Sequence, residues 1–520
     1  MNSLTEKIKK HASEADAGWG PAYGLFSKII ERKKLKIGVE IGVAFGGHSE
    51  TMLKTTTIDK LYGIDPYLHM NGYEDPMNLP QEEFDQLYTF TLERLTTFGD
   101  RYQHIRKLSK DAVNDISTKV DFIYIDADHS YKGVWEDLCT WFPKVRVGGV
   151  IGGHDYAHPN HPGVKQAIDE FFRRFDWEIH EEGEGVWWVE KKKLNVSFFI
   201  PAYNCATTIE ESVESIFNGN FGEGDEIVVT NDGSTDDTKN VLDNLRIKYS
   251  FIKIVDHKWN KGGAAARNTA VETAQNSILF CLDSDNLLVP GSIHKLKAYM
   301  LNSGADIAAF QELHYFKENK GKITHKWIFR EGSITWADCL SGSITPVASG
   351  NYMFTKESWV RSGGYPEFAG ALDAWGFGFR QLATGSKMVV MPNSFYFHRY
   401  GHESYWVREN KKDKTSLLAL QILIPFLNLI NNKDVDYIMS SKGRNVWFSN
   451  MKNHPIRLKS GEIGKHGKIV HLDENLFRNT QPNIFRLMKN KIKKYIFHVI
   501  PNLFKKILKR KNETTPRLRT

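Results

Sequence analysis

Apolar runs and amphipathic stretches alternate along the first third of the chain, between Lys36 and Lys193. This alternation is typical of a parallel sheet whose strands are connected by helices. The strands of the parallel part are expected at residues 37–41, 60–64, 120–125 and 149–151. Two last runs, residues 177–180 and 186–190, flank a glycine-containing turn and predict a closing antiparallel hairpin.

A second alternation of the same kind starts after the basic cluster at residues 191–193 and fades after Tyr405. Its strands are expected at residues 195–201, 226–230, 251–255 and 277–283. From Lys411 onward the pattern is mainly helical. The fold class is therefore α/β, with three regions expected in chain order: an α/β domain over residues 1–192, a second α/β domain over 193–410 and a helical extension over 411–520.

Length and composition are those of a folded, multi-domain protein. The 520 residues exceed what one core holds, and 41% of them are hydrophobic. The four cysteines form no CxxC pair, which argues against a disulfide framework or a cysteine zinc site. The polar first 19 residues lack the apolar core of a secretory signal. The longest apolar run, 417–430, falls short of the roughly 20 residues that span a bilayer and predicts a buried helix.

The first candidate site is a turn that follows the first predicted strand. Glu40, Gly42 and Gly46 stand in the pattern ExGxxxG, where glycines let the backbone pass close to a ligand. Asp65 ends the next strand, where a carboxylate can accept hydrogen bonds from two ribose hydroxyls. A plain structural turn is the alternative. Binding of NAD is disfavoured, because the pattern is not the GxGxxG that packs a dinucleotide pyrophosphate.

Two later segments carry a specific resemblance. Residues 122–131 (FIYIDADHSY) and 148–156 (GGVIGGHDY) resemble the fourth and fifth strands of class I S-adenosylmethionine-dependent methyltransferases, in particular the branch that O-methylates sugars. The likeness covers nearly all of residues 36–190 and implies a Rossmann-like fold with S-adenosylmethionine as cofactor. It also implies the residues that contact the cofactor: Glu40, Gly42 and Gly46 near its methionine and ribose, Asp65 on the ribose, Ser109 near the adenine, and Asp126.

Methylation of a hydroxyl needs a group that removes or weakens its proton. Several side chains converge at the ends of adjacent predicted strands: Asp126, Asp128, His129, His154 and Asp155. In related sugar methyltransferases, carboxylates at the matching positions hold a divalent ion. The resemblance thus implies Mg²⁺ on Asp126 and Asp155, with His129 or His154 as the base. The alternative for each histidine is to cap or tie a loop, and we interpret His158 and His161, in a proline-rich loop, as structural.

The second α/β region carries four ordered signals: a strand ending in PAYN, a strand ending in NDGS, the segment GGAAARN and a strand ending in DSD, within residues 196–204, 227–236, 262–268 and 278–286. Together they resemble the inverting family-two glycosyltransferases of the GT-A fold, across about residues 195–405. The likeness implies transfer of a sugar from a nucleotide-sugar donor with a divalent ion, Mg²⁺ or Mn²⁺.

The departing nucleoside diphosphate gathers negative charge, which a divalent metal neutralises as a Lewis acid. Asp283 and Asp285 follow a buried strand and supply the hard oxygen ligands that such an ion prefers. By the resemblance, Asp285 is the metal ligand and Asp283 contacts the metal or the ribose. The remaining donor contacts implied by the likeness are Pro201, Tyr203 and Asp232 around the base, and Arg267 facing the diphosphate.

An inverting transfer also needs a base for the acceptor hydroxyl. Asp373 is the candidate, although many relatives carry Glu-Asp here and this chain has Leu372 at the first position. Residues 397–406 concentrate aromatic, imidazole and basic side chains, which suit a sugar and a diphosphate. His398 or His402 is expected as a third metal ligand, with a packed aromatic loop as the alternative.

The net charge of +7 is concentrated near the C-terminus, where residues 486–511 contain Lys and Arg but no acid. Apolar residues recur there at helical spacing, which predicts basic amphipathic helices over residues 483–499 and from Pro501. Such helices bind anionic membrane surfaces or pack on their own domain. The basic excess therefore gives no reason to expect a nucleic-acid partner. We expect a cytoplasmic protein, with the inner face of the membrane as its site if the tail is an anchor.

Taken together, these features predict a bifunctional transferase of surface glycan biosynthesis, of the O-antigen or capsule type. One domain transfers a sugar from a nucleotide-sugar donor to a glycan or lipid-linked glycan, and the other methylates a sugar hydroxyl. The alternative is a glycosyltransferase whose first domain only binds or scaffolds, against which the presence of Glu40, Asp65 and Asp126 argues. Two enzymes fused only for co-expression are a third possibility.

Overall fold

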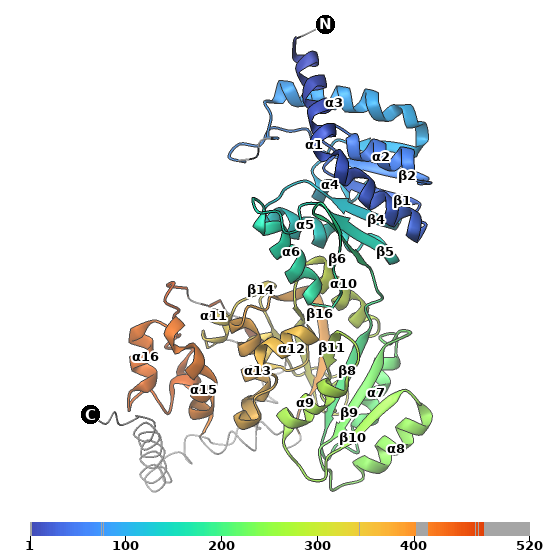
Figure 1. Ribbon diagram of the computed structural model, residues 1–520. Coiled ribbons are helices and arrows are strands. Elements are labelled where there is room, and N and C mark those ends of the chain that lie inside the picture. The colour runs from blue at the N-terminus through green and yellow to red at the C-terminus, as the bar shows by residue number, and fades with distance from the viewer. Residues whose placement is uncertain are drawn as a thin grey trace, which may run out of the picture.

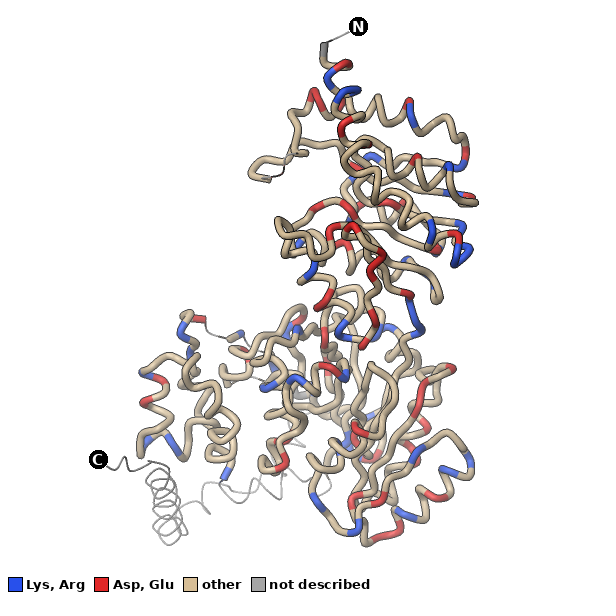
Figure 2. The backbone as a smooth tube through the Cα atoms, viewed as in Figure 1, with Lys and Arg blue, Asp and Glu red and all other residues tan. Residues whose placement is uncertain are grey.

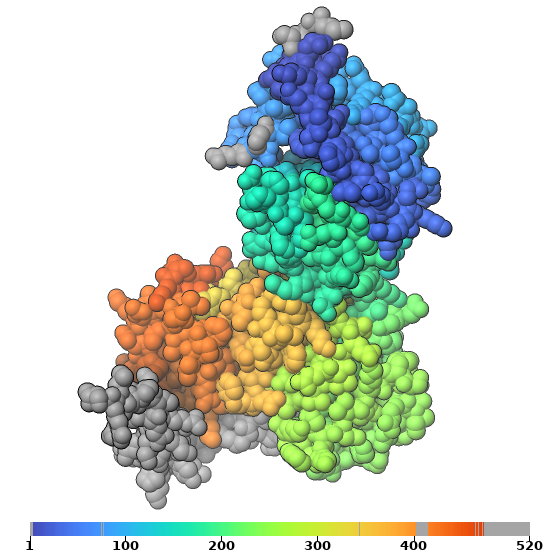
Figure 3. Space-filling model, in the orientation of Figure 1, coloured from blue at the N-terminus to red at the C-terminus, as the bar shows by residue number. Residues whose placement is uncertain are grey.

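The computed structural model describes residues 3–472 apart from 74, 76, 343, 402–413, 463 and 466. His402 and the tail from residue 473 therefore lie outside the described residues. The described chain forms two α/β domains, one above the other in Figure 1, with a group of helices beside the second domain. Figure 3 shows these domains as two lobes with a waist between them.

The first domain contains a seven-stranded sheet in the order β3-β2-β1-β4-β5-β7-β6. Strands β1 to β5 are parallel, and β7 and β6 close the sheet as an antiparallel hairpin. This arrangement confirms the predicted parallel sheet with its final hairpin. From β1 to β7 the strands span Ile37–Ile41, Lys60–Ile64, Tyr102–Ile105, Val120–Ile125, Val145–Gly153, His180–Gly183 and Val186–Glu190.

Helices cover both faces of this sheet. On β4, Phe122 and Tyr124 belong to the core beneath α1, and Ile123 and Ile125 to the core on the opposite face, because side chains alternate along a strand. Phe26 of α1 packs edge-on against both Phe122 and Tyr124. Burial on both faces explains why the central strands are almost wholly apolar. The helices are α1 (Ser3–Lys33), α2 (Gly47–Thr55), α3 (Gln81–Leu95), η1 (Thr96–Arg101), α4 (Ser109–Ala112), α5 (Tyr131–Trp141) and α6 (Pro162–Arg173).

The second domain is built on a ten-stranded sheet. Its parallel part has the order β10-β9-β8-β11, and β15 then runs antiparallel between β11 and β12. The long strand β16 pairs with β12 in parallel. The strands span Val196–Ala202 (β8), Glu226–Asn231 (β9), Ile252–Asp256 (β10), Ile278–Cys281 (β11), Ile307–Phe316 (β12), His325–Ile328 (β13), Gly332–Ile334 (β14), Met353–Thr355 (β15), Met388–Arg399 (β16) and Lys468–His471 (β17).

The helices of the second domain follow its strands in alternation. They are α7 (Ile209–Phe217), α8 (Thr238–Lys248), α9 (Gly263–Thr273), α10 (Ser292–Asn302), α11 (Trp336–Cys339), η2 (Pro346–Ala348), α12 (Lys356–Ser362), η3 (Glu367–Leu372) and α13 (Asp373–Ala383). The parallel strands and these helices confirm the predicted second α/β unit.

The described part of the predicted helical extension contains helices and one strand. The helices are α15 (Thr415–Leu423), η4 (Ile424–Leu429), α16 (Asn432–Met439) and α17 (Trp447–Asn450). Strand β17 pairs antiparallel with β13, an element that the mainly helical pattern did not predict. The chain returns there to an open sheet edge, whose free backbone groups pair with any extended segment that reaches them.

The apolar run at residues 417–430 divides into two parts. Ala419, Ile422 and Leu423 of α15 are buried, as a buried helix requires, whereas η4 has no buried residue and Ile424 is 56% exposed. Across the residues that the structure describes, no helix is both long and apolar enough to cross a membrane.

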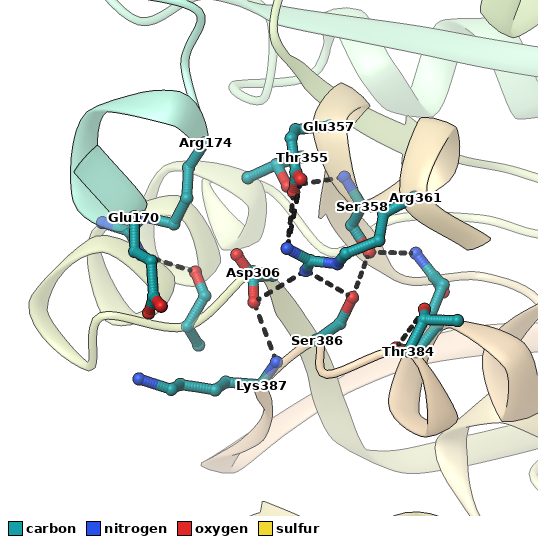
Figure 4. A network of polar contacts seen from close by, with 12 residues as sticks. Glu170, Arg174, Asp306, Thr355, Glu357, Ser358, Arg361, Thr384, Ser386 and Lys387 are labelled. Carbon is teal, nitrogen blue, oxygen red and sulfur yellow. Dashed lines mark hydrogen bonds and ion pairs between the residues drawn. The ribbon is translucent and has the colours of Figure 1, made fainter. Parts of the chain in front are cut away.

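The two domains are joined by side-chain contacts as well as by the chain. Arg174, which follows α6 and is 3% exposed, donates a hydrogen bond to the carbonyl of Ala305 at 3.1 Å. The Lys387 ammonium lies 3.7 Å from the ring centroid of Trp135. Within the second domain, the backbone N–H of Lys387 donates to the Asp306 carboxylate at 2.9 Å, which fixes the start of β16 beside this contact (Figure 4). The contacts of Arg174 and Lys387 across the domain boundary add to the covalent connection between the domains.

Candidate functional sites

A cavity of about 1160 Å³ opens at the carboxyl ends of β1, β2, β4 and β5 in the first domain. Figure 2 marks many acidic positions in this part of the domain. Ligands of doubly wound sheets usually bind at this edge, outside the carboxyl ends of the strands. All predicted site residues of the domain except Gly46 line the cavity: Glu40, Gly42, Asp65, Ser109, Asp126, His129, His154 and Asp155.

Two glycines shape the turn after β1. Gly42 has φ +88°, and a Cβ there would lie 1.9 Å from the carbonyl oxygen of Asp126. Gly46 has φ +76° and precedes the first residue of α2. Between them Ala44 is held at φ +46°, a conformation that strains a residue with a side chain. The predicted glycine turn is thus present, and its backbone is constrained by the neighbouring strand end.

The two acids of this turn are tied into the protein itself. Glu40 lies 2.7 Å from Nδ1 of His48 and accepts a hydrogen bond from the Ser49 hydroxyl. Asp65 accepts the backbone N–H groups of Val43 at 3.0 Å, Ala44 at 3.1 Å and Tyr67 at 2.9 Å. Burial raises the pKa of Asp65. Both acids therefore fix the shape of the turn, whatever else they contact.

Ser109 is occupied by its own neighbours. Its hydroxyl donates to Asp137 at 2.5 Å and accepts from the indole N–H of Trp141 at 2.8 Å. Burial raises the pKa of Asp137 to about 7. Asp137 also lines the cavity. Sequence reasoning missed it, because an acid inside an amphipathic helix carries no local signal of a site.

The predicted cluster of acids and histidines does come together. Nε2 of His129 lies 2.9 Å from Asp155 and 3.4 Å from Asp126, and Nδ1 of His154 lies 3.2 Å from Asp155. Ligand atoms of Asp126, His154 and Asp155 all lie within 4.8 Å of one another, close enough to share one metal ion. Asp155 is held at φ +60°, a strained backbone of the kind that gathers at functional sites.

The charges of this cluster are strongly coupled. Burial lowers the pKa of His129, but the hydrogen bonds to Asp126 and Asp155 have the larger combined effect. The pKa of His129 is therefore raised to about 10. Burial would raise the pKa of Asp155, but its hydrogen bonds with His129 and His154 hold that pKa well below its usual range. A histidine with such a pKa carries a proton at neutral pH. Asp155 is therefore an anion whose two neighbours compensate its charge.

In the second domain, Arg267 connects two of the predicted site acids. Its guanidinium donates to Asp283 at 2.7 Å and to Asp373 at 2.7 Å, so one cation bridges the end of β11 and the start of α13. Asp283 is held further by Asn351, whose side-chain amide donates to the carboxylate at 2.7 Å and accepts from its backbone N–H at 2.7 Å. From the sequence, residues 349–354 resemble the acceptor-side strand and loop of the family-two glycosyltransferases, but no contact of Asn351 with Asp283 was predicted, because the two are far apart in the chain.

Asp373 is the first residue of α13 and only 4% exposed. The backbone N–H of Ala374 donates to it at 2.7 Å. Burial raises the pKa of Asp373, against the opposing charge of Arg267. The predicted base is therefore buried and paired in this arrangement.

Asp285 and His398 lie on neighbouring segments. A bridge between Leu287 and Phe397 joins the loop after β11 to β16, and the Asn286 amide lies 3.3 Å from Nδ1 of His398. Burial, together with the charge of Asp283, raises the pKa of Asp285 to about 7. Burial lowers the pKa of His398 to about 4, so its imidazole is neutral at pH 7, the form in which histidine binds metals.

Asp232 ends β9 and organises the next loop. Its carboxylate lies 2.7 Å from Nδ1 of His257 and accepts the backbone N–H groups of Lys261 at 2.9 Å and Gly262 at 2.8 Å. Pro201 and Tyr203, at and after the end of β8, are partly exposed on the same edge of the sheet. The residues predicted to bind the nucleobase thus lie at adjacent strand ends, and His257 contacts one of them, Asp232.

Comparison with known proteins defines both domains. Residues 36–156 match the family model for a methyltransferase domain, and residues 197–360 match the model for glycosyl transferase family 2. The chain therefore joins a methyltransferase-type domain to a family 2 glycosyltransferase domain, which confirms the predicted fusion and its order.

Similar proteins share only parts of the chain. Chondroitin synthase of Escherichia coli is 38% identical over 98 residues, 19% of this chain and 14% of its own length. TarP of Staphylococcus aureus, a poly(ribitol-phosphate) β-N-acetylglucosaminyltransferase, is 28% identical over 165 residues, 31% of this chain and 49% of its own. WfaP of Escherichia coli is a UDP-Glc:α-D-GlcNAc-diphosphoundecaprenol β-1,3-glucosyltransferase. It is 39% identical over 98 residues, which are 19% of this chain and 38% of its own length. The chain thus spans at most about half the length of these relatives.

Among solved structures, residues 1–349 of S. aureus TarS in complex with UDP-GlcNAc align with a TM-score of 0.38 and 16% identity, over 50% of this chain and 72% of that one. This likeness is too low to bear on the sites.

Proposed function

We propose that the protein is a bifunctional transferase of surface glycan biosynthesis. The observation that carries the proposal is the presence of an acidic site at the carboxyl ends of parallel strands in each of the two matched domains. The name of WfaP specifies UDP-Glc as donor and α-D-GlcNAc-diphosphoundecaprenol, a lipid-linked sugar, as acceptor. By extension, we propose a UDP-sugar as the donor here and a glycan or lipid-linked glycan as the acceptor.

In the second domain, Asp285 is the proposed ligand of a divalent ion, Mg²⁺ or Mn²⁺. The neutral imidazole of His398 suits the same ion, which would offset the charge of the leaving diphosphate. Asp283 is already paired with Arg267 and Asn351, so it fits a ribose contact better than a metal ligand. Pro201, Tyr203 and Asp232 would hold the nucleobase end of the donor.

Asp373 is the proposed base, and Arg267 is its proposed regulator. A carboxylate paired with a guanidinium is a weak proton acceptor. Donor phosphates compete for the same guanidinium, so donor binding would draw Arg267 away and raise the basicity of Asp373 further in its buried position. Proton transfer from the acceptor hydroxyl would then follow donor binding.

In the first domain, Asp126 and Asp155 are the proposed ligands of a divalent ion beside the substrate hydroxyl. His154 is the proposed base, because its ring pairs with one carboxylate, Asp155, whereas the ring of His129 is held between Asp126 and Asp155. Bound S-adenosylmethionine would supply the methyl group. The glycine turn that Asp65 holds allows the backbone to approach that cofactor, and His154 would accept the hydroxyl proton.

The test is a donor screen with the full chain. Nucleoside diphosphate release is measured for each nucleotide sugar, beside binding of labelled S-adenosylmethionine. We expect release with one class of donor and saturable cofactor binding in the same preparation. Transfer without cofactor binding would support the alternative in which the first domain is a scaffold. If the folded protein shows neither nucleoside diphosphate release nor S-adenosylmethionine binding, the proposal is overturned.

The basic tail is proposed to anchor the protein at an anionic membrane surface. Each basic residue near such a surface contributes about 1 kcal/mol, an attraction that salt screens. Truncation after Gln481 should release the protein from anionic vesicles and leave turnover of a soluble acceptor unchanged. Equal sedimentation of the full and truncated chains would contradict the anchor and favour a tail packed on its own domain.

A further inference from the structure

The two oxygens of Asp155 face different neighbours. Oδ1 lies 3.2 Å from Nδ1 of His154, on the side of the proposed ion with Asp126. Oδ2 lies 2.9 Å from Nε2 of His129. Ligand atoms of His129, Asp155 and His161 all lie within 4.8 Å of one another. We call these three residues the imidazole set. Asp155 thus belongs to two possible ligand sets.

His161, which the sequence suggested to be structural, makes contacts that also fit a metal ligand. His161 is the residue before the first turn of α6, yet its side chain makes no capping hydrogen bond there. Its ring instead stacks on that of His129, with centroids 4.4 Å apart. His158 in the same loop does tie the backbone, since its Nδ1 accepts the N–H of Asn160 at 3.3 Å. The rings of the two histidines also stack, with centroids 4.9 Å apart, but only His161 belongs to a possible ligand set with His129 and Asp155.

His129 has an atom that the protein does not satisfy. Its Nδ1 is buried and has no hydrogen-bond partner, although the Asp75 carboxylate lies 3.6 Å away. Nδ1 therefore faces Asp75 without a hydrogen bond, and the ring presents Nε2 to Asp155, the nitrogen that it would offer to an ion between them.

We propose that the imidazole set binds a divalent first-row transition metal ion, separate from the ion proposed at Asp126. Two imidazoles and one carboxylate suit Mn²⁺, Fe²⁺, Co²⁺, Ni²⁺ or Zn²⁺, whereas Mg²⁺ prefers oxygen ligands and retains its waters. The set lies on the wall of the same cavity, so such an ion would sit beside the site proposed for methyl transfer. Its binding does not require that methyl transfer occurs.

The test is a titration of the full chain with Co²⁺ in excess Mg²⁺, followed by visible absorption and by equilibrium dialysis. All variants also carry Asp285→Ala, which lowers Co²⁺ binding at the second domain. His161→Ala and His161→Gln are compared with His158→Ala, and a thermal melt of each variant checks folding. Removing a residue that only hydrogen-bonds to a metal ligand already weakens metal binding about 10–100-fold. Loss of a ligand should therefore weaken Co²⁺ binding at least about tenfold.

We expect both His161 variants to lose Co²⁺ affinity and its absorption band, and His158→Ala to keep both. Equal Co²⁺ binding by the His161 and His158 variants would overturn the proposal, as would complete displacement of Co²⁺ by Mg²⁺. Cofactor binding is measured on the same samples. Bound Co²⁺ without cofactor binding would contradict the methyltransferase proposal and support the metal site. Cofactor binding without bound Co²⁺ would contradict the metal site and support the methyltransferase proposal.

Discussion

The two candidate sites occupy the same place in two similar sheets but pair their acids with different cations. In the first domain Asp155 faces the imidazoles of His129 and His154, and in the second Asp283 and Asp373 face the guanidinium of Arg267. An imidazole can release its proton and bind a metal, whereas a guanidinium stays charged and has no lone pair to offer. Under the proposed function, the partners in the first site can therefore become ligands, while the partner in the second site moves aside when the donor binds.

This difference also separates two acids that are two residues apart. Asp283 has a cation against it, whereas Asp285 has its pKa raised to about 7 by burial and by the charge of Asp283. An acid in such a position gains most from a bound cation. The comparison thus favours Asp285 over Asp283 as the metal ligand of the second domain.

The largest expected effect is that of Asp285→Ala on sugar transfer. Loss of a metal-holding carboxylate removes charge neutralisation and donor positioning, an effect of several kcal/mol on the barrier. Nucleoside diphosphate release should fall to background, while S-adenosylmethionine binding stays unchanged. Glu223→Ala, at a side chain that is 96% exposed, is the matched control. Near-normal release by Asp285→Ala in chelator would remove the metal from the second site.

Next in size is the effect of Arg267→Ala on stability. The substitution leaves Asp283 and Asp373 without their shared cation, and breaking a buried pair typically costs about 3–5 kcal/mol of unfolding free energy. Denaturant unfolding measures the loss, with Arg246→Ala on the exposed face of α8 as control. The loss should shrink in an Asp373→Asn background, because the two residues are coupled. An equal loss in both backgrounds would show that the bridge contributes little.

Asp137 provides the contrasting case of a buried acid without a cation. Its pKa of about 7 means that the folded protein keeps the proton over about pH 4–7, where the unfolded chain has lost it. Stability from this group should therefore fall as pH rises toward 7. Asp137→Asn, which imitates the protonated acid, should be more stable than the native chain at pH 8 by a few kcal/mol, at about 1.4 kcal/mol per pKa unit. The advantage should vanish near pH 4. Thermal melts across this range measure it, and a constant difference would refute the assignment.

The smallest expected effect is that of Asp65→Ala on the cofactor. Three backbone N–H groups lose their acceptor, so the glycine turn loosens and S-adenosylmethionine affinity should fall by about 1–3 kcal/mol. Calorimetric titration measures the affinity. Sugar transfer by the same variant should be unchanged. A parallel collapse of transfer would mean that the two sites are not independent or that the variant does not fold.

Much of the fold follows from local patterns. The strands β1, β2 and β4 lie at the predicted residues, because each is an apolar run buried on both faces. Strand β3 was missed, since Gln103 and His104 interrupt its apolar pattern at the sheet edge. The first hairpin strand was expected at residues 177–180 and lies at His180–Gly183. Exposed, polar strands such as this one leave register to pairing with a neighbour, which a local pattern does not contain.

The sequence by itself determined the two α/β units, their order and most of the acids that gather at the strand ends, because parallel strands bring their carboxyl ends to one edge whatever the loops do. Only the tertiary structure decided which partner each acid has. Arg267 meets both Asp283 and Asp373, which are 90 residues apart, and His161 stacks on His129 across a strand and a helix. Such contacts depend on how loops and helices fold over the sheet. Spacing along the chain says nothing of those distances, and they set the charge and the chemistry of each acid.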